Sequence, residues 1–408
     1  MRISADPDYQ AFCEERLQNP YPLFDRLRAE DPVHWCEPMK LWLVTRYEDV
    51  YAGLREPLLS TNRAGMYEQA LSPELKSRVQ PLLDHVSKWM LLTDDPVHKR
   101  LRKLVNLAFL PKMVDQLRPR VKSIVNELLD NVPINKPFDI MKEFASPLPA
   151  TVICEILGIP LEERYKFKTA TEGVMQFSTR GGPRLKEYAY EAHNALGELI
   201  TMFERLIQEC RHDPKDDLLS ALVLAEADGD QLSNEELYAM CVFIFLAGHE
   251  TTTNGIANGI LALLQHPDQF ESLKANLDGL ASGAVEETLR YESPVSRAVR
   301  QAIEDVEIGG KMILAGQLVV LLLGAANRDG EQFPLPGRYL IGRKPIRHLA
   351  FGYGIHFCIG SLLARIEMEV SFCAIFSRFP NLDLAGDRLT WKHTMGVRGL
   401  NALTVIAR

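Results

Sequence analysis

Residues 351–360 read Phe-Gly-Tyr-Gly-Ile-His-Phe-Cys-Ile-Gly and place one cysteine, Cys358, among three glycines. Gly352, Gly354 and Gly360 permit backbone turns and close approaches that a side chain would block, and a flat macrocyclic ligand needs that clearance. A helix-forming run, Ser361 to Phe376, follows directly. A thiolate just before a helix N-terminus is favoured by the helix dipole and by backbone N–H donors, which lower its pKa and tune a bound metal. The stretch therefore predicts a cysteine ligand loop, and a buried structural cysteine is the alternative.

The composition of the whole chain argues against several classes of protein. The 408 residues are 46% hydrophobic and carry a net charge of −8, which allows a large core and gives no basic footprint for nucleic acid. The seven cysteines form no CxxC pair, which suits a reducing compartment. The first residues lack the apolar segment of a signal peptide or anchor, and the longest apolar run, Leu237 to Gly248, is too short for a bilayer. These features predict a cytoplasmic protein with no membrane anchor and no nucleic-acid partner.

The hydrophobic periodicity predicts mostly helices. Apolar residues at 117, 121, 124, 125, 128 and 129 form one amphipathic stripe. A longer helix is expected from Ser233, where Ser-Asn-Glu-Glu has the form of a capping box, to Gln265, just before Pro267. With no repeat and no linker, residues 1–408 are predicted to form a single domain that is mainly α with small β-sheets. Short strands are expected at Leu41–Thr45, Val306–Ile308, Lys311–Ile313 and Leu318–Leu323.

The quoted stretch fits FGxGxHxCxG and resembles the haem-binding signature of the cytochrome P-450 family. Glu287-Thr-Leu-Arg290 resembles the family's ExxR pair, and Ala247-Gly-His-Glu-Thr-Thr252 resembles its oxygen-activating helix motif. His98-Lys-Arg-Leu-Arg102 is similar to its HxxxR segment, and the resemblance covers residues 15–405. It implies a single-domain cytochrome P-450 fold, with haem b held between the long central helix and the cysteine loop. Gly330 stands where the family commonly has proline, so the local shape of this loop is expected to differ from the family's.

The resemblance also implies a role for each matched residue. Cys358 is expected to be the axial ligand of the haem iron, because a thiolate ligand favours cleavage of the O–O bond. Glu287 and Arg290 are expected to brace the core behind it, and an ordinary helix ion pair is the alternative. The haem propionates are expected to meet His98, Arg102, Arg300, His348 and His356. Further haem contacts are expected from Ala247, Gly248, Phe351, Gly352 and Gly360.

One face of the long helix carries the groups expected to handle oxygen. Phe243, Ala247, Glu250 and Thr251 share this face. Ala247 and Gly248 are expected to leave room for dioxygen, which would compensate the roughly 1 kcal/mol that a glycine costs a helix. Thr251 is the expected catalytic hydroxyl; it bonds back to the carbonyl four residues earlier or, if the helix is bulged, serves the oxygen. Glu250 is expected to belong to a proton relay, and a solvated or ion-paired carboxylate is the alternative.

The positions expected to face the substrate follow from their location in the family. An apolar set fits a hydrophobic organic substrate. The expected reaction inserts one oxygen atom from O2 by hydroxylation or epoxidation, as in the tailoring of a polyketide or terpenoid, or on a fatty acyl chain. Arg297 has two alternative roles, a contact with a substrate carboxylate or a structural contact, and neither is chosen. The substrate positions are Trp89, Met90, Val174, Met175, Phe177, Phe243, Val295, Ser296, Met395 and Val397.

No flavin or iron–sulfur domain fits beside the matched motifs, so electrons from NAD(P)H are expected through a ferredoxin or flavodoxin with its reductase. Three other classes stay open: a peroxide-driven haem peroxygenase, a non-catalytic haem-binding sensor, and a cysteine–histidine hydrolase with Cys358 as nucleophile. The pairing of Glu250 with Thr251 favours the use of dioxygen over peroxide. A basic surface for an acidic ferredoxin is predicted around Arg100, Lys103, Lys112 and Arg347.

Overall fold

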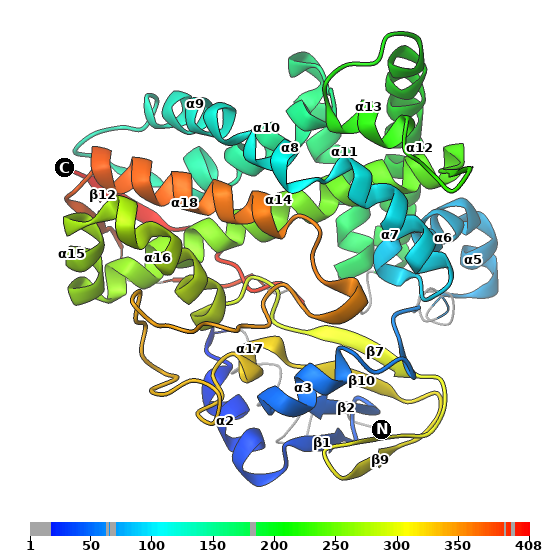
Figure 1. Ribbon diagram of the computed structural model, residues 1–408, viewed down its shortest axis with the longest axis horizontal. Coiled ribbons are helices and arrows are strands. Elements are labelled where there is room, and N and C mark those ends of the chain that lie inside the picture. Colours follow the sequence, from blue (N-terminus) through cyan, green and yellow to red (C-terminus); the bar gives the residue numbers. More distant parts are fainter. Residues whose placement is uncertain (1–17, 63–64, 66–70, 180–184, 387–388, 393–395) are drawn as a thin grey trace.

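The computed structural model describes residues 18–62, 65, 71–179, 185–386, 389–392 and 396–408. Most helices lie together on one side, and the largest sheet lies on the other (Figure 1). In the first half of the chain the helices are α2 (Tyr21–Glu30), α3 (Tyr47–Gly53), α5 (Pro73–Arg78), α6 (Gln80–Ser87), α7 (Val97–Ala108), α8 (Pro111–Asp115), α9 (Arg118–Leu129), α10 (Pro147–Ile156), α11 (Arg164–Thr179) and α12 (Leu185–His212). After these come α13 (Leu218–Val223), α14 (Asn234–Gln265), α15 (Pro267–Ala275), α16 (Leu277–Tyr291), α17 (Leu323–Ala326) and α18 (Ser361–Arg378).

The largest sheet of the described residues combines strands from both ends of the chain. Its order is β1 (Val33–Cys36), β2 (Leu41–Val44), β10 (Leu318–Leu321), β7 (Ala298–Ala302) and β3 (Leu59–Ser60). β10 runs parallel to β2 and antiparallel to β7, so Val319 pairs with both Trp42 and Arg300. A second sheet joins β11 (Leu382–Leu384), β12 (Thr404–Ala407) and β4 (Pro137–Asp139). Two-stranded sheets are formed by β8 (Val306–Ile308) with β9 (Lys311–Ile313) and by β5 (Glu226–Ala227) with β6 (Asp230–Gln231).

The long helix α14 runs through the middle of the molecule (Figure 1). The Ser233 hydroxyl accepts the N–H of Glu236, and the Glu236 carboxylate accepts the N–H of Ser233, which completes the predicted capping box. Buried residues occur on all sides of α14, which is typical of a helix inside a large core. The helix is a scaffold that fixes the side chains it carries.

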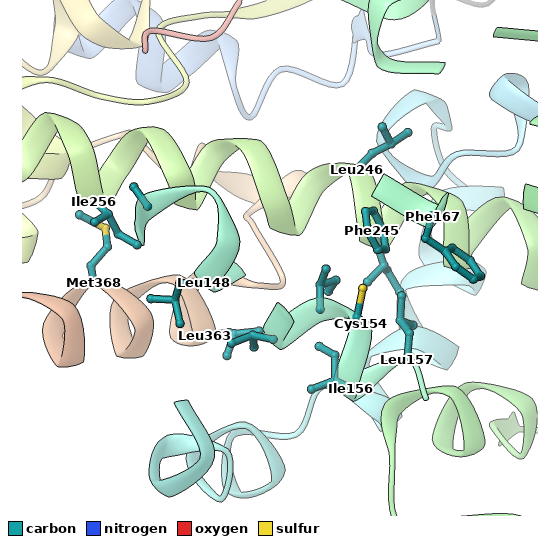
Figure 2. Close-up of a cluster of buried hydrophobic side chains, with 14 of the residues drawn as sticks. Leu148, Cys154, Ile156, Leu157, Phe167, Phe245, Leu246, Ile256, Leu363 and Met368 are labelled. Carbon is teal, nitrogen blue, oxygen red and sulfur yellow. The ribbon is translucent and has the colours of Figure 1, made fainter. Parts of the chain in front are cut away.

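Apolar side chains hold α14 against α10 and α18. Figure 2 shows Cys154 of α10 near Phe245, and Met368 of α18 near Ile256. All four residues are almost fully buried, and complete burial of such a side chain contributes about 1.5–3 kcal/mol. A Cβ added at Gly255 would lie 3.0 Å from the sulfur of Met368, so glycine permits the close approach of α14 and α18.

The structure confirms the predicted class, mainly α with small β-sheets. The long helix ends at Gln265 as expected, and the two strands at residues 306–313 match residue for residue. The strand predicted for Leu318–Leu323 ends at Leu321, and Leu323 already begins the short helix α17. In the part of the chain that is described, no helix is both long and apolar enough to cross a membrane.

Candidate active site

The loop before α18 holds Cys358 in a defined place. Gly352 and Gly354 have φ values of 69° and 74°, a region that side-chain-bearing residues rarely adopt. The N–H of Cys358 donates to the carbonyl of Phe351 at 3.0 Å, which closes the loop. A Cβ added at Gly360 would meet no atom within 4 Å, so protein packing does not require glycine there. The loop therefore leaves free space beside its cysteine.

Cys358 differs from the other cysteines that the structure describes, because it alone is exposed. Protein atoms still crowd the sulfur, and this burial raises the pKa of the Cys358 thiol. The amide of Gly360 and the cations Arg102 and Arg365 lower the pKa but do not outweigh burial. The predicted lowering of the pKa by a backbone N–H donor is present at Gly360, but burial outweighs it, so the net direction differs from the prediction. A coordinated metal ion would deprotonate the thiol outright.

Four of the five residues predicted to meet propionates lie together beside this loop. Arg102 Nη1 donates to the carbonyl of Phe357 at 2.8 Å. The rings of His98 and His356 lie 4.1 Å apart between centroids. Burial, followed by the charges of His98 and Arg300, lowers the pKa of His356 to about 3. Arg300 comes from the middle of β7 and is 6% exposed.

His98 shows that this group of residues has a hydrogen-bonding capacity that the described part of the protein does not satisfy. It is 2% exposed, and neither ring nitrogen forms a hydrogen bond in the described part of the chain. Its nearest carboxylate oxygen, on Asp95, lies 3.7 Å from Nδ1. A buried polar group without a hydrogen bond costs about 1–3 kcal/mol. A carboxylate brought by a ligand would satisfy His98 and lie among the cations, so these residues fit the propionates of a haem.

His348, the fifth residue predicted to meet a propionate, lies beside α16. Its Nε2 lies 3.2 Å from Glu286 of α16, and its Nδ1 accepts the N–H of Ala350 at 3.3 Å. Arg365 of α18 donates to the same carboxylate at 2.6 Å and covers the ring of Phe351 at 4.5 Å. Burial alone would raise the pKa of Glu286, but the neighbouring His348 and Arg365 lower it to about 2. His348 thus helps to hold α16 against α18, while its buried Nε2 forms no hydrogen bond within the described residues, so its contact with a propionate stays a prediction.

Glu287 and Arg290 form a fully buried pair with no exposed surface. Arg290 Nε and Nη2 donate to the two carboxylate oxygens of Glu287 at 2.8 and 2.7 Å. Arg290 also donates to the backbone carbonyls of Asn327, Pro336 and Arg338. A charge buried this deeply persists only when it is paired and hydrogen-bonded. The pair thus ties α16 to the segment 327–340, which agrees with a bracing role.

The oxygen-motif residues lie in the middle of α14. Ala247 is exposed although most of the helix is buried, and Phe243 one turn earlier is partly buried. The hydroxyl of Thr251 donates to the carbonyl of Ala247 at 2.8 Å, and α14 is a continuous α-helix at this point. Of the two alternatives for Thr251, the structure shows the bond back to the preceding turn.

Gly248 does not face the same space as Ala247. A Cβ added at Gly248 would lie 3.0 Å from Cδ1 of Ile153, on α10. The prediction that Gly248 leaves room for dioxygen stays a prediction, which the direction of this Cβ does not support. Its glycine permits the close packing of α14 on α10, and this packing compensates the low helix propensity.

Glu250 is ion-paired, which is the alternative recognised from the sequence. Its Oε1 lies 3.1 Å from Nζ of Lys392, a residue 142 positions later in the chain. Next to it on α14, His249 lies 3.3 Å from the hydroxyl of Ser146. Burial, followed by the charges of Lys168 and Lys392, lowers the pKa of His249 to about 4. Lys392 was missed because no local pattern in the sequence links it to Glu250.

The structure brings together some of the predicted substrate positions. The rings of Trp89 and Phe243 lie next to each other, with centroids 5.7 Å apart and planes tilted by 32°. Val295 forms an isolated bridge with Val397, and the N–H of Ser296 donates to the carbonyl of Gly396 at 3.1 Å. Ser296, Val397, Lys392 and Arg297 line one small cavity.

The other substrate positions are separate from these two groups. Met90 is buried beside Trp89, while Val174 and Phe177 are buried in α11. The Met175 side chain and the whole of Met395 lie outside the described residues. The structure therefore joins Trp89 to Phe243 and Val295 to Val397, and leaves the α11 positions as predictions.

A metal at this site would depend on Cys358 and a non-protein group. Within residues 18–62, 65, 71–179, 185–386, 389–392 and 396–408, no three His, Cys, Asp or Glu side chains gather as a metal site. An iron bound to Cys358 would therefore take its remaining ligands from a macrocycle. The clearance at Gly360 and the unsatisfied ring of His98 fit that group.

Comparison with known proteins gives the class of this chain. The sequence profile described as Cytochrome P450 matches residues 69–389. The polyketide biosynthesis cytochrome P450 PksS of Bacillus subtilis (strain 168) is 41% identical over 96% of this chain and 96% of its own length. The cytochrome P450 monooxygenase PikC of Streptomyces venezuelae is 40% identical over 98% of this chain and 93% of its own. P450BioI, solved with an acyl carrier protein ligated to hexadec-9Z-enoic acid, aligns with a TM-score of 0.89 and 36% identity over 97% and 99% of the two chains.

The chain belongs to the cytochrome P450 family. It is a bacterial-type cytochrome P450 monooxygenase, an enzyme class that uses haem iron and O2. Its relatives include proteins of secondary metabolism and of fatty-acid-related reactions.

Proposed function

We propose that this enzyme inserts one oxygen atom from O2 into an apolar acyl or polyketide chain, with Cys358 as the axial ligand of haem b. The observation that carries the haem site is the group around the cysteine loop: exposed Cys358, with Arg102, His356 and the unsatisfied ring of His98 beside it. When bound, the haem supplies reductive activation of O2, and a thiolate ligand favours O–O cleavage.

The residues of the chain divide the remaining tasks. Arg102, Arg300, His98 and His356 would hold the two propionates, because neutral histidines still donate one N–H each. Glu250 would pass protons from solvent toward the hydroxyl of Thr251. That hydroxyl lies on the turn of α14 that carries the exposed Ala247, so both act on the same face.

The apolar lining supports the proposed substrate class. Trp89 with Phe243, and Val295 with Val397, offer apolar surface from four separate parts of the chain. Such surface binds a substrate mainly through buried area. The relatives PksS and P450BioI, which are named for a polyketide and solved with a carrier-linked fatty acid, support an extended substrate.

Reduced carbon monoxide difference spectra test the haem ligand. The purified protein should show the absorption band of thiolate coordination, and Cys358→Ser should abolish both the band and turnover. Cys373→Ser is the matched control, because Cys373 is also free and partly exposed but lies on α18. A band that survives Cys358→Ser would overturn the assignment.

Titration with hexadec-9Z-enoic acid, free and ligated to an acyl carrier protein, tests the substrate class. Displacement of water from the iron should shift the Soret band for at least one form. If neither form shifts the band while rigid polycyclic compounds do, the acyl or polyketide assignment is wrong.

The electron donor is proposed to be a separate ferredoxin or flavodoxin. Two residues of the predicted basic surface are already neutralised: Arg100 pairs with Asp230 and Glu236, and Lys103 pairs with Asp228. Lys112 and Arg347 form no ion pair within the described residues, so they would carry the docking charge. Lys112→Glu should slow reduction at low salt, and Lys103→Glu should have a smaller effect. Equal reduction rates for wild type and Lys112→Glu would contradict this site.

A further inference from the structure

The carboxylate of Glu250 is held by one lysine from a distant part of the chain. Nζ of Lys392 lies 3.1 Å from Oε1 of Glu250, and the two side chains are only 25% and 18% exposed. A partly buried pair is screened less by water and salt than an exposed one. Glu250 directly precedes Thr251 on α14, so the lysine restricts where this acid can lie relative to the threonine hydroxyl.

The backbone of Lys392 is itself anchored. Its N–H donates to the carbonyl of Gly399 at 2.8 Å, and Trp391 bridges to Leu400. Arg398 lies 3.4 Å from the ring centroid of Trp391 and binds Glu292 at 2.8 Å. The segments 389–392 and 396–400 thus brace each other, and the lysine side chain extends from them to α14.

The same two segments lie along one face of α14 for more than two turns. Glu250, Asn254 and Asn258 are spaced four residues apart and share that face. Asn258 Nδ2 donates to the carbonyls of Glu292 and Arg398 at 3.2 and 3.0 Å. A Cβ added at Gly399 would lie 2.0 Å from Oδ1 of Asn254, so only glycine allows this approach. The pair of Lys392 and Glu250 is the end of this row of contacts.

We propose that Lys392 is a positioning residue of the oxygenation reaction, which keeps the Glu250 carboxylate within reach of Thr251 and links it to the segments 389–392 and 396–400. The inference rests on the proposed function, in which Glu250 moves protons. Val397 of the same segment bridges to Val295, so a substrate seated there would contact the segment that also sets Lys392.

The consequence of losing Lys392 follows from the balance of the reaction. Oxygenation consumes O2, two electrons and two protons, and releases the oxidised substrate with water. If a proton does not arrive at the right place, the same two electrons and two protons leave as hydrogen peroxide and the substrate stays unchanged. Peroxide released per NADPH therefore reports on proton delivery, and it is measurable with or without a substrate.

The test compares Lys392→Met, which keeps the aliphatic stem, with Lys392→Arg, which keeps the charge. With a ferredoxin and its reductase, Lys392→Met should raise peroxide per NADPH about threefold or more and increase the solvent isotope effect on NADPH oxidation. Lys392→Arg should stay within about twofold of wild type. The carbon monoxide band should be unchanged in both. Lys88→Met is the matched control, because Lys88 pairs with Glu235 in the first turn of α14, far along the helix from Thr251.

The outcomes separate this inference from the proposed function. If Lys392→Met releases the wild-type share of peroxide, Lys392 does not position the acid. Equal impairment of the Met and Arg variants, with a weakened carbon monoxide band, would show a structural role and would also overturn the inference. A wild-type protein without the thiolate band would instead overturn the proposed haem site, whatever Lys392 does.

Discussion

The cysteine loop and the middle of α14 carry residues predicted to serve the same reaction, but the two regions are built in different ways. Around Cys358, the decisive features are local: two glycines at positive φ and a closing hydrogen bond from Cys358 to Phe351. On α14, the decisive partners come from far away, because Gly248 packs on Ile153 and Glu250 pairs with Lys392. A sequence motif therefore predicts the geometry of its residues where its own backbone makes the contacts. It does not predict that geometry where side chains from distant parts of the chain make them.

The largest expected effect tests the brace on the cysteine side. Arg290→Ala should lower the free energy of unfolding by about 3 kcal/mol, because it removes the two-point partner of the buried Glu287 carboxylate and leaves it with Arg343 alone as its cation. The backbone carbonyls of Asn327 and Pro336 would also lose the donor that Arg290 supplies. Urea unfolding of the purified variants measures this change.

Arg205→Ala is the control for that measurement. Arg205 pairs with Glu209 on the exposed surface of α12, and such pairs contribute about 0–1 kcal/mol. If both variants lose the same stability, the Glu287–Arg290 pair is not the brace that the buried geometry indicates.

The second prediction concerns α14 and uses two threonines with the same hydrogen bond. The hydroxyl of Thr251 donates to the carbonyl of Ala247 at 2.8 Å, and that of Thr253 donates to the carbonyl of His249 at 2.9 Å. Thr251→Ala should lower product formed per NADPH by roughly tenfold to a hundredfold, as expected for loss of a positioned proton donor. Thr253→Ala removes an equivalent backbone contact and should leave this ratio within about twofold. Similar losses in both variants would show that Thr251 acts only on the helix.

The fold was predictable wherever local signals agree. The capping box at Ser233 and Pro267 after Gln265 define the ends of α14, and the structure reproduces them. The strand predicted to reach Leu323 was two residues too long, because an apolar run does not show where a strand gives way to a short helix. The order of the five-stranded sheet had no local signal, since β2 and β10 lie far apart in the sequence.

The site was predictable only in part, for a related reason. The signature predicts Cys358, His356 and Gly360, but it does not predict that His348 of the same loop lies 3.2 Å from Glu286 of α16. Spacing along the chain cannot distinguish two histidines of one loop that point to different neighbours. The pKa of Cys358 was misjudged because burial depends on the whole surrounding fold.

Acid should affect α6 before it affects the contacts of α16 with α18. Burial lowers the pKa of His85 to about 4, so His85 is neutral in the native state and charged in the unfolded chain below about pH 6.5. Its stabilising contribution is complete above that pH and is lost as the pH falls toward 4. Glu286, with a pKa of about 2, contributes above about pH 4.5 and is lost only below it. At pH 5 the α6 region should therefore loosen while the contacts of α16 with α18 persist.

Hydrogen exchange at pH 5 and pH 7 measures this order. His85→Leu removes the titrating group from a buried position and should reduce the loss of stability between the two pH values by about 2 kcal/mol. An unchanged pH dependence in His85→Leu, or earlier exchange in α18 than in α6, would contradict the assignment.

The smallest expected effect sharpens the comparison most directly, because it separates the two adjacent small residues of α14. Gly248→Ala gains about 1 kcal/mol of helix propensity and meets Cδ1 of Ile153 at 3.0 Å, the flexible end of a side chain. The two effects should nearly cancel, so the net change in unfolding free energy should stay within about 1 kcal/mol. Gly248→Ala with Ile153→Val should be more stable than Gly248→Ala alone, because the close contact is removed.

Carbon monoxide affinity of the reduced protein should be unchanged in Gly248→Ala but weakened in Ala247→Val, since only Ala247 is exposed on this part of the helix. Equally weakened carbon monoxide affinity in both variants would indicate that Gly248 also lines the space for oxygen.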